Sequence, residues 1–191
     1  QSEISERKRY EEKLLLRDRA IEASSAGIII TDARQKDNPI IYANPAIEQM
    51  TGYSREELIG RNPRIWQGPE TSQEAIESVR TALRELHPCL VTLKNYRKDG
   101  TTFWNELYIS PVRDNDGNLT HFIGVQTDVT QLRRAEEERH ELEIAKQIQF
   151  SLLPAAPLHI DGVVIAGFCL PATHIGGDYF DYFYSRDAVD I

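Results

Sequence analysis

The sequence has little cysteine and no long apolar run. Cys89 and Cys169 are its two cysteines and show no Cys-x-x-Cys or Cys/His spacing, so we expect buried thiols, not a disulfide framework or zinc site. The longest apolar stretches, 27–30 and 163–170, are far shorter than the roughly 20 residues that span a bilayer. A basic segment leading into an apolar one, as in secretory signals, is also missing. We therefore expect a cytoplasmic protein with no membrane association.

Positive charge is also scarce. Lys and Arg number 22 against 30 Asp and Glu, which gives a net charge of −8. Nucleic acids and anionic membranes attract basic surfaces, so this balance argues against both as partners. The 191 residues are 40% hydrophobic, enough for one domain with a real core plus extensions. The chain does not begin with Met, from which we expect that it is trimmed.

The order of elements predicts an α+β fold. Residues 2–25 are charged and helix-prone, and short strands are expected at 27–32 and 40–43. Helices follow, with capping boxes at Ser54–Glu57 and Thr71–Glu74 and an end near His87-Pro88. Long strands then alternate with the turn sequences at 98–100 and 114–117. The prediction is a five-stranded antiparallel sheet with short helices on one face, flanked by amphipathic helices at both ends.

Strand parity groups polar amides with apolar residues. Side chains alternate faces along a strand, so Asn105 shares a face with Phe103 and Leu107. The same holds for Asn95 beside Leu93 and for Gln126 beside Phe122. Any one of these amides could simply point to water. Three in register predict a flat, apolar ligand with a polar edge, because buried amides must be hydrogen-bonded.

The opposite face of the sheet is also apolar. It carries Tyr96, Trp104, Tyr108, Ile123 and Val125. A patch of this kind needs a cover. The N-terminal helix, the helix after residue 130 or a second subunit could supply it.

Residues 60–71, GRNPRIWQGPET, crowd Asn62, Arg64 and Gln67 into one turn around Pro63. With KNYRKDGTTFWN and HFIGVQTDVT, this stretch makes residues 27–130 resemble the flavin-binding light-oxygen-voltage (LOV) branch of the PAS sensor domains. The resemblance implies FMN as the cofactor, with FAD or riboflavin as alternatives. It assigns Asn62, Gln67, Asn95, Asn105 and Gln126 to the flavin ring and ribityl chain, and Arg64 and Arg80 to the phosphate. Flanking residues in this assignment are Ile29, Val79, Leu93, Leu107, Ile109 and Phe122.

Pro63 departs from the family pattern. The LOV family has a cysteine at this position, and its thiol adds covalently to the photoexcited flavin. Proline cannot do this, and neither Cys89 nor Cys169 is expected to replace it. We therefore expect signalling by flavin photoreduction, with Trp66 or Trp104 as electron donor and rotation of the Gln126 amide as the response. A redox sensor and an idle scaffold are the alternatives.

The residues after 130 indicate an output segment. Asp128-Val129-Thr130 resembles the motif that ends PAS domains and opens a signalling helix. Apolar residues beyond it recur at spacings of three, four or seven, which predicts a coiled coil over 131–153 and a parallel homodimer. The flanking helices and the outer face of the sheet are the expected dimer contacts.

Residues 145–191 resemble the start of the bacterial stress- and sporulation-type 2C serine/threonine phosphatases. In that family Asp178 of the Gly-Gly-Asp motif helps to hold the Mn²⁺ or Mg²⁺ pair, and Asp181 is a weaker candidate. The remaining ligands of such a site are absent from this chain, so we expect no catalytic residues and an empty metal site here. Phosphorylated regulators of sigma factors are the substrates that the resemblance implies for the full-length protein.

Together these features predict a helix at 1–25, a LOV/PAS sensor at 26–130, a coiled-coil linker at 131–153 and a truncated phosphatase segment at 154–191. The predicted function is a cysteine-less blue-light or redox sensor that regulates a phosphatase. A light-insensitive PAS module that only dimerises or binds a ligand is the alternative. An active phosphatase within this chain is a third hypothesis, which predicts metal-dependent turnover.

Overall fold

The computed structural model describes residues 2–153, 156–160, 163–166, 183–184 and 189–190. It divides into two units, 1–130 and 131–191. The predicted Asp178, Asp181 and Cys169 lie outside the described residues. In the part of the chain that the structure describes, no helix is long and apolar enough to cross a membrane.

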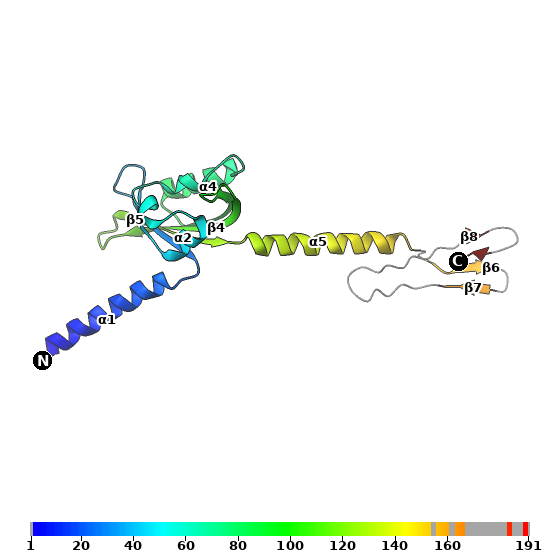
Figure 1. Cartoon of the computed structure of the whole chain (residues 1–191), viewed down its shortest axis with the longest axis horizontal. Helices are drawn as coiled ribbons and strands as arrows, with labels where there is room; N and C mark the ends of the chain where they lie inside the picture. The colour runs from blue at the N-terminus through cyan, green and yellow to red at the C-terminus, as the bar shows by residue number, and fades with distance from the viewer. Residues whose placement is uncertain (1, 154–155, 161–162, 167–182, 185–188, 191) are drawn as a thin grey trace. The chain divides into compact units, whose positions relative to one another are not determined.

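The first unit is built on one antiparallel sheet, which confirms the predicted fold class (Figure 1). Its five strands lie in the order β2-β1-β5-β4-β3. They are β1 (Gly27–Asp32), β2 (Ile40–Ala43), β3 (Cys89–Tyr96), β4 (Thr102–Arg113) and β5 (Leu119–Asp128). The first strand and the last thus meet in the middle of the sheet.

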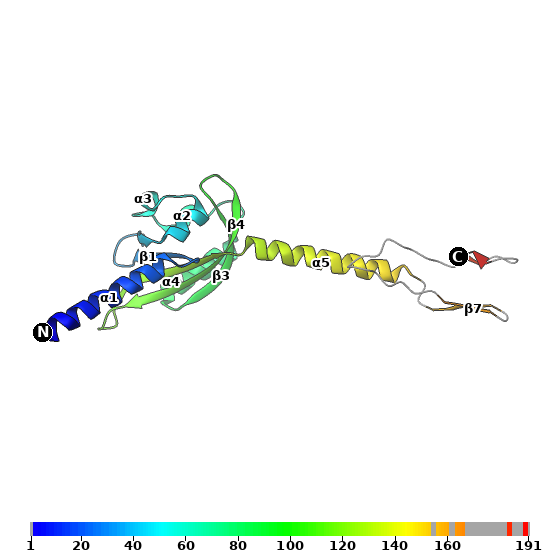
Figure 2. The same cartoon turned by 60° about the horizontal axis from the view of Figure 1, so that its bottom comes forward.

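Four short helices connect β2 to β3: α2 (Pro45–Thr51), α3 (Arg55–Leu58), the 3-10 helix η1 (Pro63–Trp66) and α4 (Gln73–Glu85). Contacts join α2 to β1, α3 to β2 and α4 to β3. Figure 2 shows α2 and α3 together to one side of the sheet. A core of Ile29, Ile40, Ile47, Leu58 and Trp66 fills the space between these layers.

The predicted helix start at Thr71 is wrong by one residue. Ser72 is the N-cap, and its hydroxyl accepts a hydrogen bond from the backbone N–H of Ala75. The Thr71 hydroxyl instead donates to the backbone carbonyl of Lys94 at 2.6 Å. Thr71 therefore attaches the loop before α4 to the edge strand β3.

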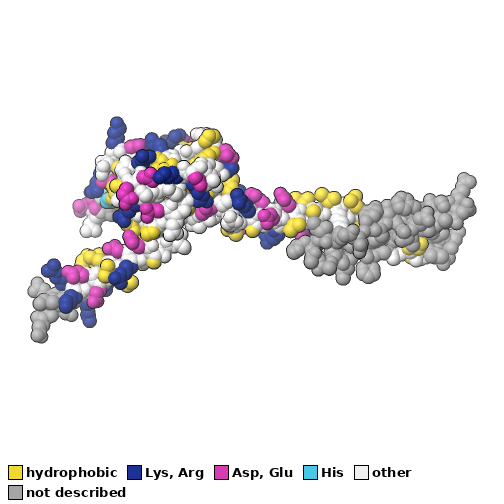
Figure 3. Space-filling view, in the orientation of Figure 1, with side chains coloured by type: hydrophobic (Ala, Val, Ile, Leu, Met, Phe, Trp, Pro, Cys, Tyr) yellow, Lys and Arg dark blue, Asp and Glu magenta, His cyan; other side chains and the backbone are white. Residues whose placement is uncertain are grey.

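Helices α1 (Ser2–Glu22) and α5 (Thr130–Ser151) flank the sheet domain in sequence. Their large apolar side chains are exposed in the single chain, among them Leu14 and Leu16 in α1 and Leu132 and Ile148 in α5. Figure 3 shows basic and acidic side chains interspersed over the visible face of the sheet domain and α1. The second unit also contains two small hairpins, β6 (Leu158–Ile160) with β7 (Val163–Ile165) and β8 (Phe183–Tyr184) with β9 (Val189–Asp190).

Candidate ligand pocket

A cavity lies between the sheet and the helices of the first unit. Its volume, counted as the space open to the centre of a water molecule, is about 110 Å³. One water needs only about 10–15 Å³ on this measure, so the protein's own side chains do not fill the space. Its lining residues come from β1, β3, β4, β5, η1, α4 and the loop before β2.

Twelve of the thirteen residues predicted as cofactor contacts line this cavity: Ile29, Asn62, Arg64, Gln67, Val79, Leu93, Asn95, Asn105, Leu107, Ile109, Phe122 and Gln126. The thirteenth, Arg80, is exposed on α4 and forms an ion pair with Glu77 at 3.5 Å, and it is not among the lining residues.

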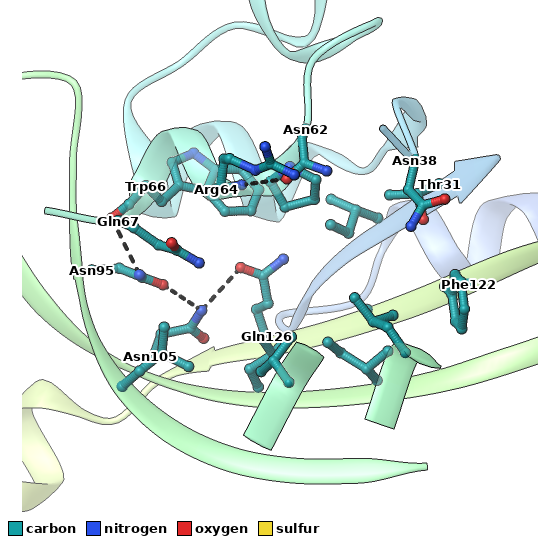
Figure 4. A pocket seen from close by; sticks show the side chains of 18 residues that line it. Thr31, Asn38, Asn62, Arg64, Trp66, Gln67, Asn95, Asn105, Phe122 and Gln126 are labelled. Atoms are coloured by element: carbon teal, nitrogen blue, oxygen red, sulfur yellow. Dashed lines mark hydrogen bonds between the residues drawn. The ribbon is translucent and has the colours of Figure 1, made fainter. Parts of the chain in front are cut away.

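The cavity is closed on one side by a chain of buried amides. Asn95, Asn105 and Gln126 are only 3%, 1% and 1% exposed. The Asn105 side-chain amide donates to Asn95 Oδ1 at 2.9 Å and to Gln126 Oε1 at 3.0 Å. The Asn95 amide in turn donates to the backbone carbonyl of Trp66 at 3.2 Å. Figure 4 shows these side chains together at one end of the pocket, with Thr31, Asn38 and Phe122 toward the other end.

Strand register produces this arrangement. Asn105 lies opposite Leu93 on β3, and Gln126 lies opposite Leu107 on β4. The amides therefore occupy diagonal positions on adjacent strands, which is within reach of long side chains.

Two atoms of these three side-chain amides have no hydrogen-bond partner among the described residues. Asn105 Oδ1 and Gln126 Nε2 are buried and make no hydrogen bond to the described residues. A buried amide atom without a partner costs roughly 1–3 kcal/mol. An acceptor and a donor left open beside an apolar cavity fit the edge of a planar heteroaromatic ring that carries both kinds of group. The residues present thus fit a flavin ring.

The apolar walls suit the flat faces of such a ring. Ile29, Leu93, Ile109 and Phe122 are each less than a tenth exposed. Gly124 lies on the same face of β5, and a Cβ placed there would come within 3.0 Å of the Ile29 side chain. The absence of a side chain at Gly124 therefore leaves space in the cavity.

Two polar residues of the η1 turn, Asn62 and Arg64, also have local partners. Asn62 caps η1 by accepting from the Arg64 backbone N–H at 2.9 Å, and its amide group donates to the Asp37 carbonyl. The Arg64 guanidinium contacts the Asp37 carboxylate at 2.5 Å. Gln67 is exposed at the end of this turn. None of the described residues lining the cavity is a cysteine.

Four lining residues were not among the predicted cofactor contacts: Thr31, Asn38, Leu83 and Gly124. Strand alternation does put Gly124 on the same face as Phe122 and Gln126, but that pattern does not show that its missing side chain leaves space. Asn38 follows Asp37 in a turn where both have positive φ, 69° and 46°, and no periodic signal indicates where such a loop side chain will lie.

Cys89 and the two tryptophans have distinct surroundings. Cys89, the first residue of β3, is half-buried and outside the cavity lining. Trp66 is 2% exposed and lines the cavity, and its indole N–H has no partner among the described residues. Trp104 is on the opposite face of the sheet, where the Lys94 ammonium lies 6.0 Å from its ring centre.

Comparison with known proteins identifies the sensor region. A family model for the PAS domain matches residues 25–131. The blue-light photoreceptor of Listeria monocytogenes is 45% identical over 130 residues, which are 68% of this chain and 49% of that protein. A blue-light-activated histidine kinase of Brucella anthropi is 42% identical over 132 residues, 67% of this chain and 27% of the kinase.

Solved structures agree with this match. A light-oxygen-voltage domain studied with a flavin analogue is 41% identical, with a TM-score of 0.58, over 64% of this chain and 92% of that chain. The chain spans about half, or less, of the length of the two curated relatives. It belongs to the PAS domain family, and LOV domains of blue-light photoreceptors are its relatives over the sensor region.

Proposed function

We propose that residues 26–130 bind a flavin and serve as a blue-light or redox sensor. The observation that carries this proposal is the pair of open amide atoms, Asn105 Oδ1 and Gln126 Nε2, buried beside an apolar cavity. FMN is the flavin we favour, with FAD and riboflavin as alternatives. Asn95, Asn105 and Gln126 would hold the ring edge, with Asn62 and Gln67 nearer the ribityl chain and Arg64 nearer the phosphate.

Pro63 determines what this pocket can do with light. A bound flavin supplies blue-light absorption and an excited state that is a strong oxidant. The protein offers no thiol among the described lining residues, and Pro63 has no reactive atom. We propose that Trp66, which lines the pocket, supplies an electron, with Trp104 as the alternative donor.

Gln126 is suited to report a change at the ligand edge. Its Oε1 accepts from Asn105, which leaves Nε2 as the group open to the cavity. If the ligand atom beside it becomes a donor, rotation of the amide restores a hydrogen bond by presenting Oε1 instead. That rotation breaks the Gln126–Asn105 bond and so alters the contact between β4 and β5.

The end of β5 supplies a route toward α5. The Asp128 carboxylate contacts the Arg97 guanidinium at 2.6 Å and accepts from the Thr130 backbone N–H at 2.9 Å. The Thr130 hydroxyl accepts from the Trp104 backbone N–H on β4, also at 2.9 Å. We propose that strain at Gln126 reaches the first residue of α5 through these contacts.

The proposed output is a change in a dimer that regulates a phosphatase. Two chains would pair through the outer face of the sheet and through α1 and α5. The phosphatase, its Mn²⁺ or Mg²⁺ ions and its phosphorylated sigma-factor regulator belong to this proposal for the full-length protein. Asp178, the candidate metal ligand of the phosphatase, lies outside the described residues.

An absorption spectrum of the purified chain, taken before and after blue illumination, tests the sensor proposal. We expect a yellow protein whose blue absorption falls on illumination and returns in air. Trp66→Phe should bind the flavin equally well and respond more slowly. Absence of flavin from the protein, with no uptake of added FMN, would contradict the proposal.

A light-insensitive dimerisation module is the second candidate. An apolar row on the outer face of the sheet, formed by Leu90, Tyr108, Val125 and Ile28, favours this candidate. Leu90 and Tyr108 in this row are 66% and 42% exposed. This candidate predicts a colourless protein that is nevertheless dimeric. The same spectrum, taken together with the molecular mass in solution, separates the two functions.

A further inference from the structure

At one rim of the pocket, an acidic residue forms hydrogen bonds with two of the lining residues. Asp37, in the loop between β1 and β2, accepts from the Asn62 side chain through its backbone carbonyl and from Arg64 through its carboxylate. Asn62 and Arg64 both line the cavity, whereas Asp37 does not. The Asp37 carboxylate therefore holds the guanidinium of a lining residue from a position outside the cavity lining.

The backbone at this rim suits the residues that occupy it. Asp37 and Asn38 adopt φ values of 69° and 46°, a left-handed conformation that Asp and Asn tolerate better than most residues. The Asn62 contact uses the Asp37 backbone, so it does not need the carboxylate. Loop geometry and charge at residue 37 can thus be changed separately.

A ligand with a terminal phosphate and one with a terminal hydroxyl group would interact differently with the Asp37–Arg64 ion pair. A terminal phosphate that binds Arg64 must compete with the Asp37 carboxylate and then lie close to its negative charge. A ligand that ends in a hydroxyl group displaces no ion pair. The Asp37 and Arg64 side chains are 52% and 62% exposed, so water screens their pairing and a ligand can break it.

We propose that Asp37 is a specificity-determining residue that reduces the preference of the pocket for a phosphorylated flavin over the same flavin without its phosphate. The inference rests on the proposed flavin-binding function and adds a selectivity to it. On this basis riboflavin is a competent ligand of this pocket beside FMN, and residue 37 sets the ratio of the two affinities.

Asp37→Asn is the test variant. It keeps the backbone acceptor for Asn62, the side-chain size and the tolerance for positive φ, and removes only the charge. Glu70→Gln is the matched control, because Glu70 forms an exposed pair with Lys94 at the same 2.5 Å and lies outside the cavity lining. Adding Arg64→Ala to both the wild type and Asp37→Asn completes a double-mutant cycle.

The full chain, stripped of flavin, is titrated with FMN and with riboflavin by fluorescence quenching at low and high salt. We expect Asp37→Asn to raise the ratio of FMN affinity to riboflavin affinity by about fivefold at low salt. The increase should shrink in about 1 M salt, where the Debye length is about 3 Å. It should be absent from Glu70→Gln and from the pair of variants lacking Arg64.

An unchanged ratio in Asp37→Asn, with both flavins still bound, would overturn this inference and leave the proposed function standing. An equal rise of the ratio in Glu70→Gln would overturn it in the same way. Failure of every variant and of the wild type to bind either flavin would overturn the proposed function, and this inference with it.

Discussion

Asn105 is the residue on which the buried amides converge. Both of its side-chain N–H groups are used, one for Asn95 and one for Gln126. Its own carbonyl oxygen has no partner among the described residues. Asn105 thus stabilises the domain even without a ligand. In the proposed function it also contacts the ligand.

Replacing Asn105 by Leu should destabilise the protein even without a ligand. The change leaves the side-chain oxygens of Asn95 and Gln126 buried without this donor, and we expect a loss of about 2 kcal/mol in the free energy of unfolding. Urea denaturation of the flavin-free protein measures it. Thr127→Val, at an exposed position on β5, is the control and should stay within about 0.5 kcal/mol. Equal stabilities of wild type and Asn105→Leu would show that the amide chain contributes nothing.

The backbone at position 63 can accommodate residues other than proline. Pro63 is the first residue of η1, where a backbone N–H has no helical partner, and Asn62 caps the turn through Arg64 instead. Pro63→Cys should therefore keep the pocket and supply the missing nucleophile. We expect blue-light bleaching of the bound flavin that reverses in the dark, followed by absorption spectroscopy.

Pro63→Ser is the matched control for that variant, because it has a similar size and no thiol. It should bind flavin without the reversible bleaching. A Pro63→Cys protein that binds flavin and bleaches no differently from Pro63→Ser would mean that residue 63 is not placed for this reaction.

At the scale of elements, the junction between β5 and α5 depends on one carboxylate. Burial raises the pKa of Asp128, but hydrogen bonds from the Arg97 side chain and from the hydroxyl and backbone N–H of Thr130 outweigh it and leave the pKa below its ordinary value of 3.8. A depressed pKa means that the carboxylate favours the folded state above the pKa of the unfolded chain. This contribution is lost as the pH falls through the folded-state value.

We therefore expect Asp128→Asn to lower stability at pH 7 and to flatten the dependence of stability on pH below about 4. The measurement is the free energy of unfolding in urea at pH 7, 5 and 3. Glu106→Gln makes the same charge change at an exposed position on β4. If Asp128→Asn and wild type lose stability in parallel from pH 5 to pH 3, the carboxylate has no role in fastening the junction.

At the scale of the whole molecule, the outer face of the sheet needs a cover. Register places Leu90 opposite Tyr108, Tyr108 opposite Val125, and Val125 opposite Ile28. These residues form one apolar row across four strands. An exposed apolar row of this length is typical of an interaction surface.

A charge in this row should dissociate the proposed dimer. Burying an unpaired carboxylate at an apolar interface is strongly unfavourable, so we expect Leu90→Glu combined with Tyr108→Glu to be monomeric by light scattering at concentrations where the wild type is dimeric. Ile59→Glu, at another exposed apolar position at the end of α3, should remain dimeric. A dimer that survives the double substitution would place the interface elsewhere.

Local patterns explain the part of the architecture that the sequence could predict. Turn residues at 98–100 and 114–117 separate the long strands, and the positive φ of Gly100 and Gly117 agrees with them. Alternation along β4 and β5 grouped Asn105 and Gln126 with apolar neighbours, and both are buried. The predicted start of α4 was wrong because the Thr71 hydroxyl does not cap the helix. It donates a hydrogen bond to the Lys94 carbonyl on the edge strand β3 instead.

Strand period and side-chain chemistry are enough to predict which residues share a face and that residue 63 carries no nucleophile. The assembled fold was needed to show that β1 lies beside β5, that the three amides are hydrogen-bonded to one another, and that Asp37 pairs with Arg64. Each of these contacts joins residues that are far apart in the chain. The free energy that stabilises such contacts comes from burial and charge pairing in the folded domain, so a local sequence pattern does not predict them.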